Sequence, residues 1–202
     1  MFVAIELPAD ARDAVVDVID RLRAHNAYAS WTPRENLHCT LSFLGDIADD
    51  RVAAVSEAVG DSVRDMVDFP THLTDVGGFP SNAKPRVVWI GLDDGAGGIA
   101  ALADAVRSSL VPLGFEAEHR RFRAHVTLAR LRDPRACDLS VAVEPVRFLV
   151  DRVVLFESRL GRPHAVHAPV ATFPFRRAPA PPRPDRDDPP DLPGRDFSPP
   201  EV

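Results

Sequence analysis

The chain has 202 residues, a net charge of −6 and two cysteines. This length suits a single domain or one compact pair of lobes, and 45% hydrophobic residues indicate a globular protein. The negative charge argues against a protein that coats nucleic acid or an anionic membrane through bulk charge. It leaves room for a small anionic substrate held in a locally basic cleft.

The cysteines and the N-terminus indicate a cytoplasmic protein. Cys39 and Cys137 are too isolated for a disulfide framework or a zinc site, which suits a reducing compartment. Residues 1–8 lack a basic region and predict a first strand rather than a signal peptide. No segment approaches the roughly 18 uninterrupted apolar residues that a membrane span needs. We expect a monomer without membrane contact.

Hydrophobic periodicity predicts helices and strands in turn along the chain. The first elements are a strand at 2–7, a helix at 10–25, a strand at 37–44, a helix at 49–66 and strands at 69–79 and 86–92. A helix at 99–112 and strands at 115–119, 122–130, 145–150, 152–158 and 167–175 follow. Few long parallel crossovers are present, which favours an α+β architecture. Gly97-Gly98 lacks a following Gly-Lys-Ser/Thr and predicts a helix entry turn, not a phosphate loop.

The prolines divide the chain into two parts. Nine of the twenty lie within 178–202, together with six acidic residues and three arginines. This stretch has too little apolar surface to offset the entropy of ordering it. The sequence therefore predicts a folded domain over 1–176 and an extended, disordered tail over 177–202.

One short pattern, His-x-Thr-Leu, occurs twice, at His38 and 87 residues later at His125. Side chains alternate along a strand, so His38 shares a face with Thr40, and His125 shares a face with Thr127. Each strand then presents an imidazole and a hydroxyl about 7 Å apart. Two such strands side by side would surround a phosphate with two imidazoles and two hydroxyls.

This set of groups suits phosphodiester cleavage without a metal or other cofactor. A neutral histidine can take a proton from water while a protonated one gives a proton to the departing ribose oxygen. Threonine hydroxyls can hydrogen-bond the non-bridging oxygens as charge builds there. Zinc is a weaker alternative, because neither histidine face carries a further ligand. Cys39 faces away from His38 and is expected in the core.

Six arginines and one acid lie between positions 119 and 135, around the second motif. Alternation places Arg121 and Arg123 on the face of His125, as supporting basic groups. The same alternation turns Arg130 away, unless the strand bulges or ends near Ala129.

Phe43 follows the first motif at the offset at which Arg130 follows the second. By alternation alone Phe43 belongs to the core. If both residues turn inward instead, Phe43 can stack on a base while the guanidinium binds phosphate.

The ordered motifs resemble the 2H phosphoesterases and, within them, the RNA 2′,3′-cyclic phosphodiesterases also described as 2′-5′ RNA ligases. The resemblance rests on segments 2–8, 31–45, 85–91, 122–130 and 153–161. It implies a bilobal, pseudo-symmetric α+β fold in which two antiparallel sheets face each other across a central cleft, with helices outside.

The resemblance also implies a reaction, the hydrolysis of RNA 2′,3′-cyclic phosphate ends to 2′-phosphomonoesters. The partners would be RNA 3′ ends or nucleoside 2′,3′-cyclic phosphates, and no cofactor is implied. By motif order His38 is the proton donor and His125 the acceptor. The phosphate would be bound by Thr40, Thr127 and Arg130, with Phe43 assisting.

The chain departs from the family at two positions. Family members often carry Tyr where this chain has Phe156, and another Tyr shortly after the next glycine, where this chain reads Gly-Arg-Pro-His-Ala-Val-His over 161–167. The hydrogen bonds of those hydroxyls are therefore not carried over.

Two other functions stay open at this point. One is a phosphodiesterase acting on small cyclic nucleotides or an ADP-ribose cyclic phosphate, because the His/Thr pairs contact only the phosphate. The other is a nucleotide- or RNA-binding module without turnover, against which the two intact motifs argue. Under the leading hypothesis, the protein would have RNA 2′-5′ ligation, essentially the reverse step, as a second activity.

Overall fold

The computed structural model describes residues 1–93, 95–116, 121–159, 161 and 164–178. Its elements in chain order are β1 (Phe2–Glu6), α1 (Ala9–His25), β2 (Ser30–Trp31), the 3₁₀ turn η1 (Arg34–Asn36), β3 (His38–Phe43), α2 (Asp49–Val63), β4 (Phe69–Phe79), β5 (Val87–Asp93), α3 (Gly98–Leu110), the 3₁₀ turn η2 (Val111–Leu113), β6 (His125–Arg130), β7 (Arg147–Val150), β8 (Arg152–Arg159) and β9 (Val166–Pro174).

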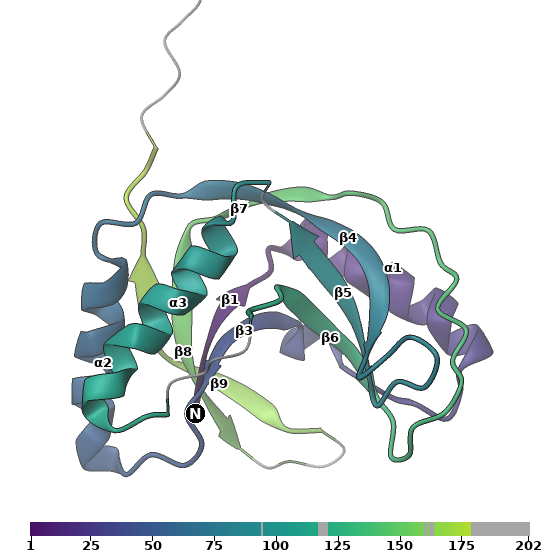
Figure 1. Cartoon of the computed structure of the whole chain (residues 1–202), viewed down its shortest axis with the longest axis horizontal. Coiled ribbons are helices and arrows are strands. Elements are labelled where there is room, and N and C mark those ends of the chain that lie inside the picture. Colours follow the sequence, from purple (N-terminus) through teal and green to yellow (C-terminus); the bar gives the residue numbers. More distant parts are fainter. Residues whose placement is uncertain (94, 117–120, 160, 162–163, 179–202) are drawn as a thin grey trace, which may run out of the picture.

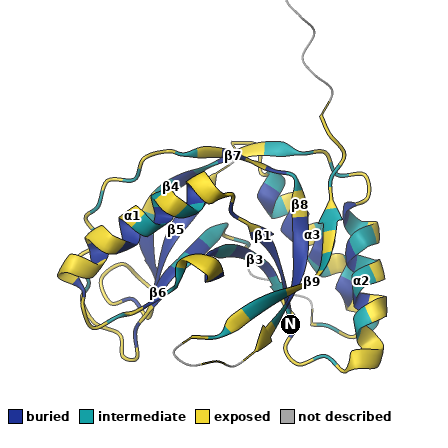
Figure 2. Cartoon of the chain, turned by 180° about the vertical axis from the view of Figure 1, so that it is seen from behind, coloured by how far each residue is buried: buried dark blue, intermediate teal, exposed yellow. Residues whose placement is uncertain are grey.

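The strands form two antiparallel sheets, which confirms the predicted α+β class (Figure 1). The first sheet has the order β3-β1-β8-β9, and the second has the order β2-β6-β5-β4-β7. Helices α2 and α3 pack beside the first sheet and α1 beside the second, as Figures 1 and 2 show from opposite sides. The helices thus cover the outer faces of the sheets.

Each helix forms because apolar residues recur every three or four positions and give it one apolar stripe. The buried residues of α1 are Ala11, Val15, Val18, Ile19 and Leu22; those of α2 are Val55, Val59 and Val63; those of α3 are Ile99, Leu102, Ala103, Val106 and Leu110. Gly97 precedes α3 with φ of 78°, a left-handed conformation that glycine adopts without strain. The predicted helix entry turn is therefore confirmed.

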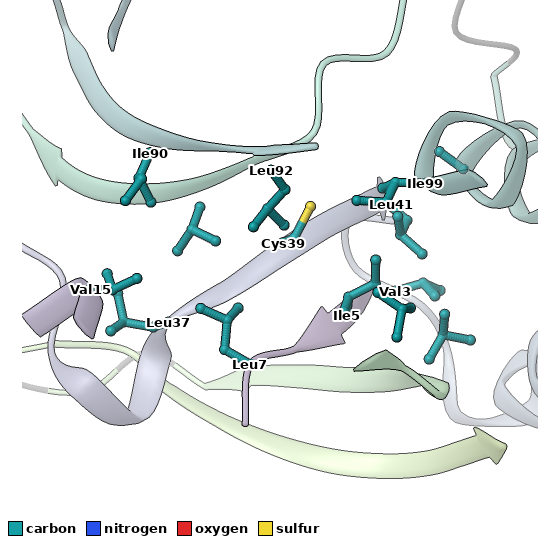
Figure 3. Close-up of a cluster of buried hydrophobic side chains, with 14 of the residues drawn as sticks. Val3, Ile5, Leu7, Val15, Leu37, Cys39, Leu41, Ile90, Leu92 and Ile99 are labelled. Atoms are coloured by element: carbon teal, nitrogen blue, oxygen red, sulfur yellow. The ribbon is translucent and has the colours of Figure 1, made fainter. Parts of the chain in front are cut away.

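One apolar core joins the helices to the faces of both sheets that the helices cover. Figure 3 shows Leu92 of the second sheet next to Cys39 of the first, with Leu41 and Ile5 on one side of this pair and Ile90 on the other. Cys39 is fully buried among them, and burial raises the pKa of its thiol to about 12. Cys39 is thus a small core residue, as predicted.

A repeated strand–helix–strand unit relates the two halves of the fold. In the first, β1 is joined through α1 to its antiparallel neighbour β3; in the second, β5 is joined through α3 to its neighbour β6. Each pair contains one β-bulge. Leu41 is the extra residue in β3, between Thr40 and Ser42, and Leu128 is the extra residue in β6. The bulges stand at the same position of the two motifs.

Several predicted boundaries change. Strand β6 begins at His125 rather than at 122, and 121–124 lie outside the ladder. Within the strand expected at 115–119, residues 115 and 116 are irregular, and the rest lies outside the described residues. The short strand β2 and the turn η1 were not predicted, because two or three residues carry no periodicity. Residues 179–202 of the predicted tail also lie outside the described part.

Trp89 of β5 lies across Gly77 of β4, its cross-strand neighbour. A Cβ atom at Gly77 would overlap the indole ring. We expect Gly77→Ala to lower the free energy of unfolding by about 1–3 kcal/mol, because the ring must leave its place in a packed site. Urea titration measures this, with Ser81→Ala in an exposed loop as the control. Equal stability of Gly77→Ala and wild type would contradict the packing described.

Candidate active site

A cavity of about 910 Å³ opens between the two sheets. His38 and Thr40 of β3 line it, as do His125 and Thr127 of β6. These two strands lie next to each other where the lobes meet (Figure 1). The fold therefore places both His-x-Thr motifs in one cavity, one motif from each sheet.

The bulge in β6 brings Arg130 to this cavity. Leu128 and Ala129 are consecutive and both buried, so the alternation of side chains restarts after them. Arg130 then lines the cavity on the same side as Thr127. Strict alternation would have turned Arg130 away from the cavity. The sequence allowed Arg130 to face the cavity only if the strand bulged or ended near Ala129, and the structure contains that bulge.

The bulge in β3 has the same effect on Phe43. This ring lines the cavity and is 72% exposed, so the expectation that it belongs to the core is wrong. Strict alternation would put Ser42 on the face of Thr40, but Ser42 is absent from the described lining of the cavity. The extra residue Leu41 accounts for both differences, because it moves each later side chain to the other face.

Both imidazoles are held by the same type of contact. Nδ1 of His38 lies 2.7 Å from the carbonyl oxygen of Asn36, and Nδ1 of His125 lies 2.7 Å from that of Arg123. A carbonyl can only accept, so Nδ1 carries the proton of each neutral ring and donates it. Nε2 is then the nitrogen left for acid–base chemistry in each ring.

Each of the two imidazoles packs against an aromatic ring. His38 stacks on Phe2 with the ring centroids 4.6 Å apart. Phe2 belongs to a small apolar cluster with Ala4, Val154 and Phe156. His125 stands edge-on to Phe79 at 5.1 Å between centroids. These apolar contacts restrict each ring and keep water from one of its sides.

Burial lowers the pKa of His38 to about 4, although its contact with the Asn36 carbonyl opposes the shift. Positive charge on His167, Arg130 and His125 lowers the pKa further. Burial likewise lowers the pKa of His125. Both imidazoles are therefore neutral near pH 7 in the free protein. An anion placed between them would favour the protonated forms.

The remaining polar groups of the cavity suit a tetrahedral anion. Within the described part of the chain, the hydroxyls of Thr40 and Thr127 have no hydrogen-bond partner, and Arg130 forms no ion pair. Asp46 is the one carboxylate among the described lining residues. Two hydroxyls and a guanidinium are thus available to phosphate oxygens.

Arg121 and Arg123 are placed differently from the sequence expectation. Their side chains line a separate hollow next to the cavity, with Trp89 between. The expectation assumed a strand from 122, whereas β6 begins at His125 and alternation does not extend upstream. Arg123 still contacts the site through its backbone carbonyl, which orients His125.

Other classes of site find little support in the described residues. None of them form a group of three or more His, Cys, Asp or Glu side chains that could hold a metal ion. Cys39 lies on the core side of β3, away from His38. No helix in this part of the chain is long and apolar enough to cross a membrane.

A family model described as the 2′-5′ RNA ligase superfamily matches residues 8–162, a range that includes both motifs. The chain belongs to this superfamily. The resemblance noted from the sequence is thereby confirmed.

Individual proteins of known sequence or structure agree with this assignment. An RNA 2′,3′-cyclic phosphodiesterase of Archaeoglobus fulgidus is 32% identical over 141 residues, which cover 69% of this chain and 77% of the relative. A crystal structure of a Thermus thermophilus protein matches with a TM-score of 0.78 at 26% identity, over 87% of this chain and 97% of that chain. Escherichia coli LigT, crystallised with 3′-AMP, matches with a TM-score of 0.68 at 28% identity, over 86% and 96%.

The superfamily cleft of this chain is also lined by two histidines that the sequence reasoning missed, His164 and His167. His167 of β9 stands edge-on to His38 at 5.3 Å and to Phe2 at 4.9 Å between ring centroids. Its Nδ1 is buried and has no hydrogen-bond partner within the described part of the chain. The one available signal was the stretch 161–167, where family members carry Tyr and this chain carries histidines.

This contact gives a prediction about the pKa of His38. We expect His167→Phe to raise it above about 4, because the substitution removes a nearby positive charge and keeps a ring in place. Burial remains, so the pKa should stay below the ordinary value near 6.5. NMR titration of the His38 ring measures the shift. His25→Phe, at the exposed end of α1, is the control. An unchanged or lower pKa in His167→Phe would show that the two imidazoles are not coupled.

Proposed function

We propose that the protein hydrolyses RNA 2′,3′-cyclic phosphate ends to 2′-phosphomonoesters, without a metal, by acid–base catalysis with two histidines. The observation that carries this proposal is the paired geometry of the motifs. Each bulged strand presents an imidazole to one cavity, and each Nδ1 is engaged by a backbone carbonyl, so two Nε2 atoms remain for the substrate. The names of the superfamily and of the relatives support the same reaction.

The reaction divides into two proton transfers. Nε2 of His125 takes a proton from water as the water oxygen attacks phosphorus. The bond between phosphorus and O3′ breaks, and Nε2 of His38 gives its proton to O3′. The phosphate stays on O2′. The histidines have then exchanged protonation states, and proton exchange with solvent restores them.

His38 needs a proton for this role, although its pKa in the free protein is about 4. The cyclic phosphate supplies the missing interaction, because its negative charge beside the ring favours imidazolium. Substrate binding and protonation of His38 are thus coupled. The order of donor and acceptor follows the family resemblance.

The other lining residues bind the substrate. Thr40, Thr127 and Arg130 hydrogen-bond the non-bridging oxygens, which gain charge in the transition state. Phe43, exposed at the rim, offers a flat face on which the terminal base can stack. A ribose 5′-hydroxyl in place of the attacking water would form a 2′-5′ linkage by the same steps. All the described lining residues lie within the proposed domain, 1–176.

We expect His38→Ala and His125→Ala each to lower turnover of uridine 2′,3′-cyclic phosphate at least about a hundredfold in EDTA, because each removes one of the two proton transfers. Turnover by the double variant should be little lower than by either single variant, since the loss of one histidine already prevents the coupled proton transfer. His25→Ala, on the surface of α1, is the matched control and should retain wild-type turnover.

Steady-state kinetics with separation of the 2′- and 3′-nucleotide products makes the measurement. Equal turnover by wild type and both single variants would contradict the proposal, as would activity that EDTA abolishes.

A further inference from the structure

A second hollow, of about 540 Å³, opens beside the second motif. In the strand register Gly91 lies opposite His125 and Trp89 lies opposite Thr127, so these two lining residues share the face of that motif. Leu92, on the other face of β5, and residues 97, 99 and 100 at the start of α3 also line the hollow. We call it the arginine hollow; the residues used below are Thr74, Trp89, Asp93, Arg121 and Arg123.

The Trp89 ring lines the arginine hollow and also contacts His125, the proposed base. The indole ring of Trp89 lies 6.4 Å from the ring of His125, measured between centroids. The guanidinium of Arg123 lies 4.2 Å from the Trp89 ring centroid and 5.9 Å from that of Phe79, which lines the cavity. The hollow therefore adjoins the second motif through these two aromatic rings.

The hollow is positively charged in its described part. Neither Arg121 nor Arg123 forms an ion pair there. The Arg123 guanidinium lies 4.2 Å from the centroid of the indole ring, a cation–π contact that leaves its N–H groups available to an acceptor. Asp93 is the one carboxylate among the described lining residues, and its Oδ1 accepts a hydrogen bond from the N–H of Gly95 at 2.8 Å.

The proposed reaction assigns no role to the side chains of Arg121 and Arg123. A mononucleoside 2′,3′-cyclic phosphate carries one phosphate, which the two motifs and Arg130 bind. An RNA chain carries a further phosphate one ribose upstream, on the 5′ side of the terminal nucleotide. Two guanidinium groups in the adjoining hollow, neither in an ion pair within the described part of the chain, match this second phosphate in charge.

We propose that the arginine hollow binds the phosphate on the 5′ side of the terminal nucleotide, so that the protein prefers an RNA chain to a mononucleotide. This inference rests on the proposed function and names its substrate class. Arg121 and Arg123 donate hydrogen bonds to that phosphate, and Thr74 adds a hydroxyl at the wall. The cyclic phosphate itself stays with the two histidines.

The test compares two substrates in EDTA, uridine 2′,3′-cyclic phosphate and a short RNA oligonucleotide with the same end. The measured quantity is the ratio of kcat/KM for the oligonucleotide to that for the mononucleotide. We expect Arg121→Ala to lower this ratio about tenfold, because one phosphate contact is lost. The salt dependence of oligonucleotide binding should become shallower by about 0.7 in log–log slope. Arg121 is the better target, since the Arg123 backbone also holds His125.

Arg64→Ala is the matched control, because it removes an exposed arginine at the end of α2 and should leave the ratio at its wild-type value. An Arg121→Ala ratio equal to wild type overturns the subsite, even if both substrates turn over normally. If wild type hydrolyses neither substrate, the proposed function fails. Fluorescence anisotropy with the same oligonucleotide carrying a 2′-phosphate then decides the subsite, and equal Kd values for wild type and Arg121→Ala would overturn it.

Discussion

The site depends on one extra residue in each motif strand. A regular strand would direct His and Thr to the cleft and would turn the fifth residue after each His into the core. The bulges at Leu41 and Leu128 shift the alternation by one position and return Phe43 and Arg130 to the cleft. Because both strands carry the bulge at the same place, each sheet adds the fifth residue after its His to the cavity, a phenyl ring from one and a guanidinium from the other.

A second constraint is electrostatic. Aromatic and apolar surroundings keep His38 and His125 neutral in the free protein, while Arg130 stands near both. The imidazoles of such a cavity are neutral when it is empty. An anion that enters favours their protonation, since burial strengthens every charge interaction inside the cavity. In the proposed reaction, the local field of Arg130 and one imidazolium group that forms on substrate binding matters more than the net charge of −6.

Much of this organisation was predictable from the sequence. The α+β class, the three helices and the pairing of the two His-x-Thr segments follow from periodicity and from a repeated motif. The inward turn of Phe43 and Arg130 did not follow from alternation and was implied only by the family resemblance, because a bulge is set by strand register, which no local pattern encodes. The separate place of Arg121 depends on where β6 begins. The contact of His167 with His38 joins β9 to β3, which are two strands apart in the sheet, so it also needed the tertiary arrangement.

The central claim is that two histidines in opposite protonation states act on one phosphate. The pH dependence of kcat/KM for uridine 2′,3′-cyclic phosphate, measured in EDTA, tests it most directly. The account predicts a bell-shaped profile, with one limb for the base and one for the acid. A rate that rises steadily with pH and appears only when a divalent metal is supplied would contradict it.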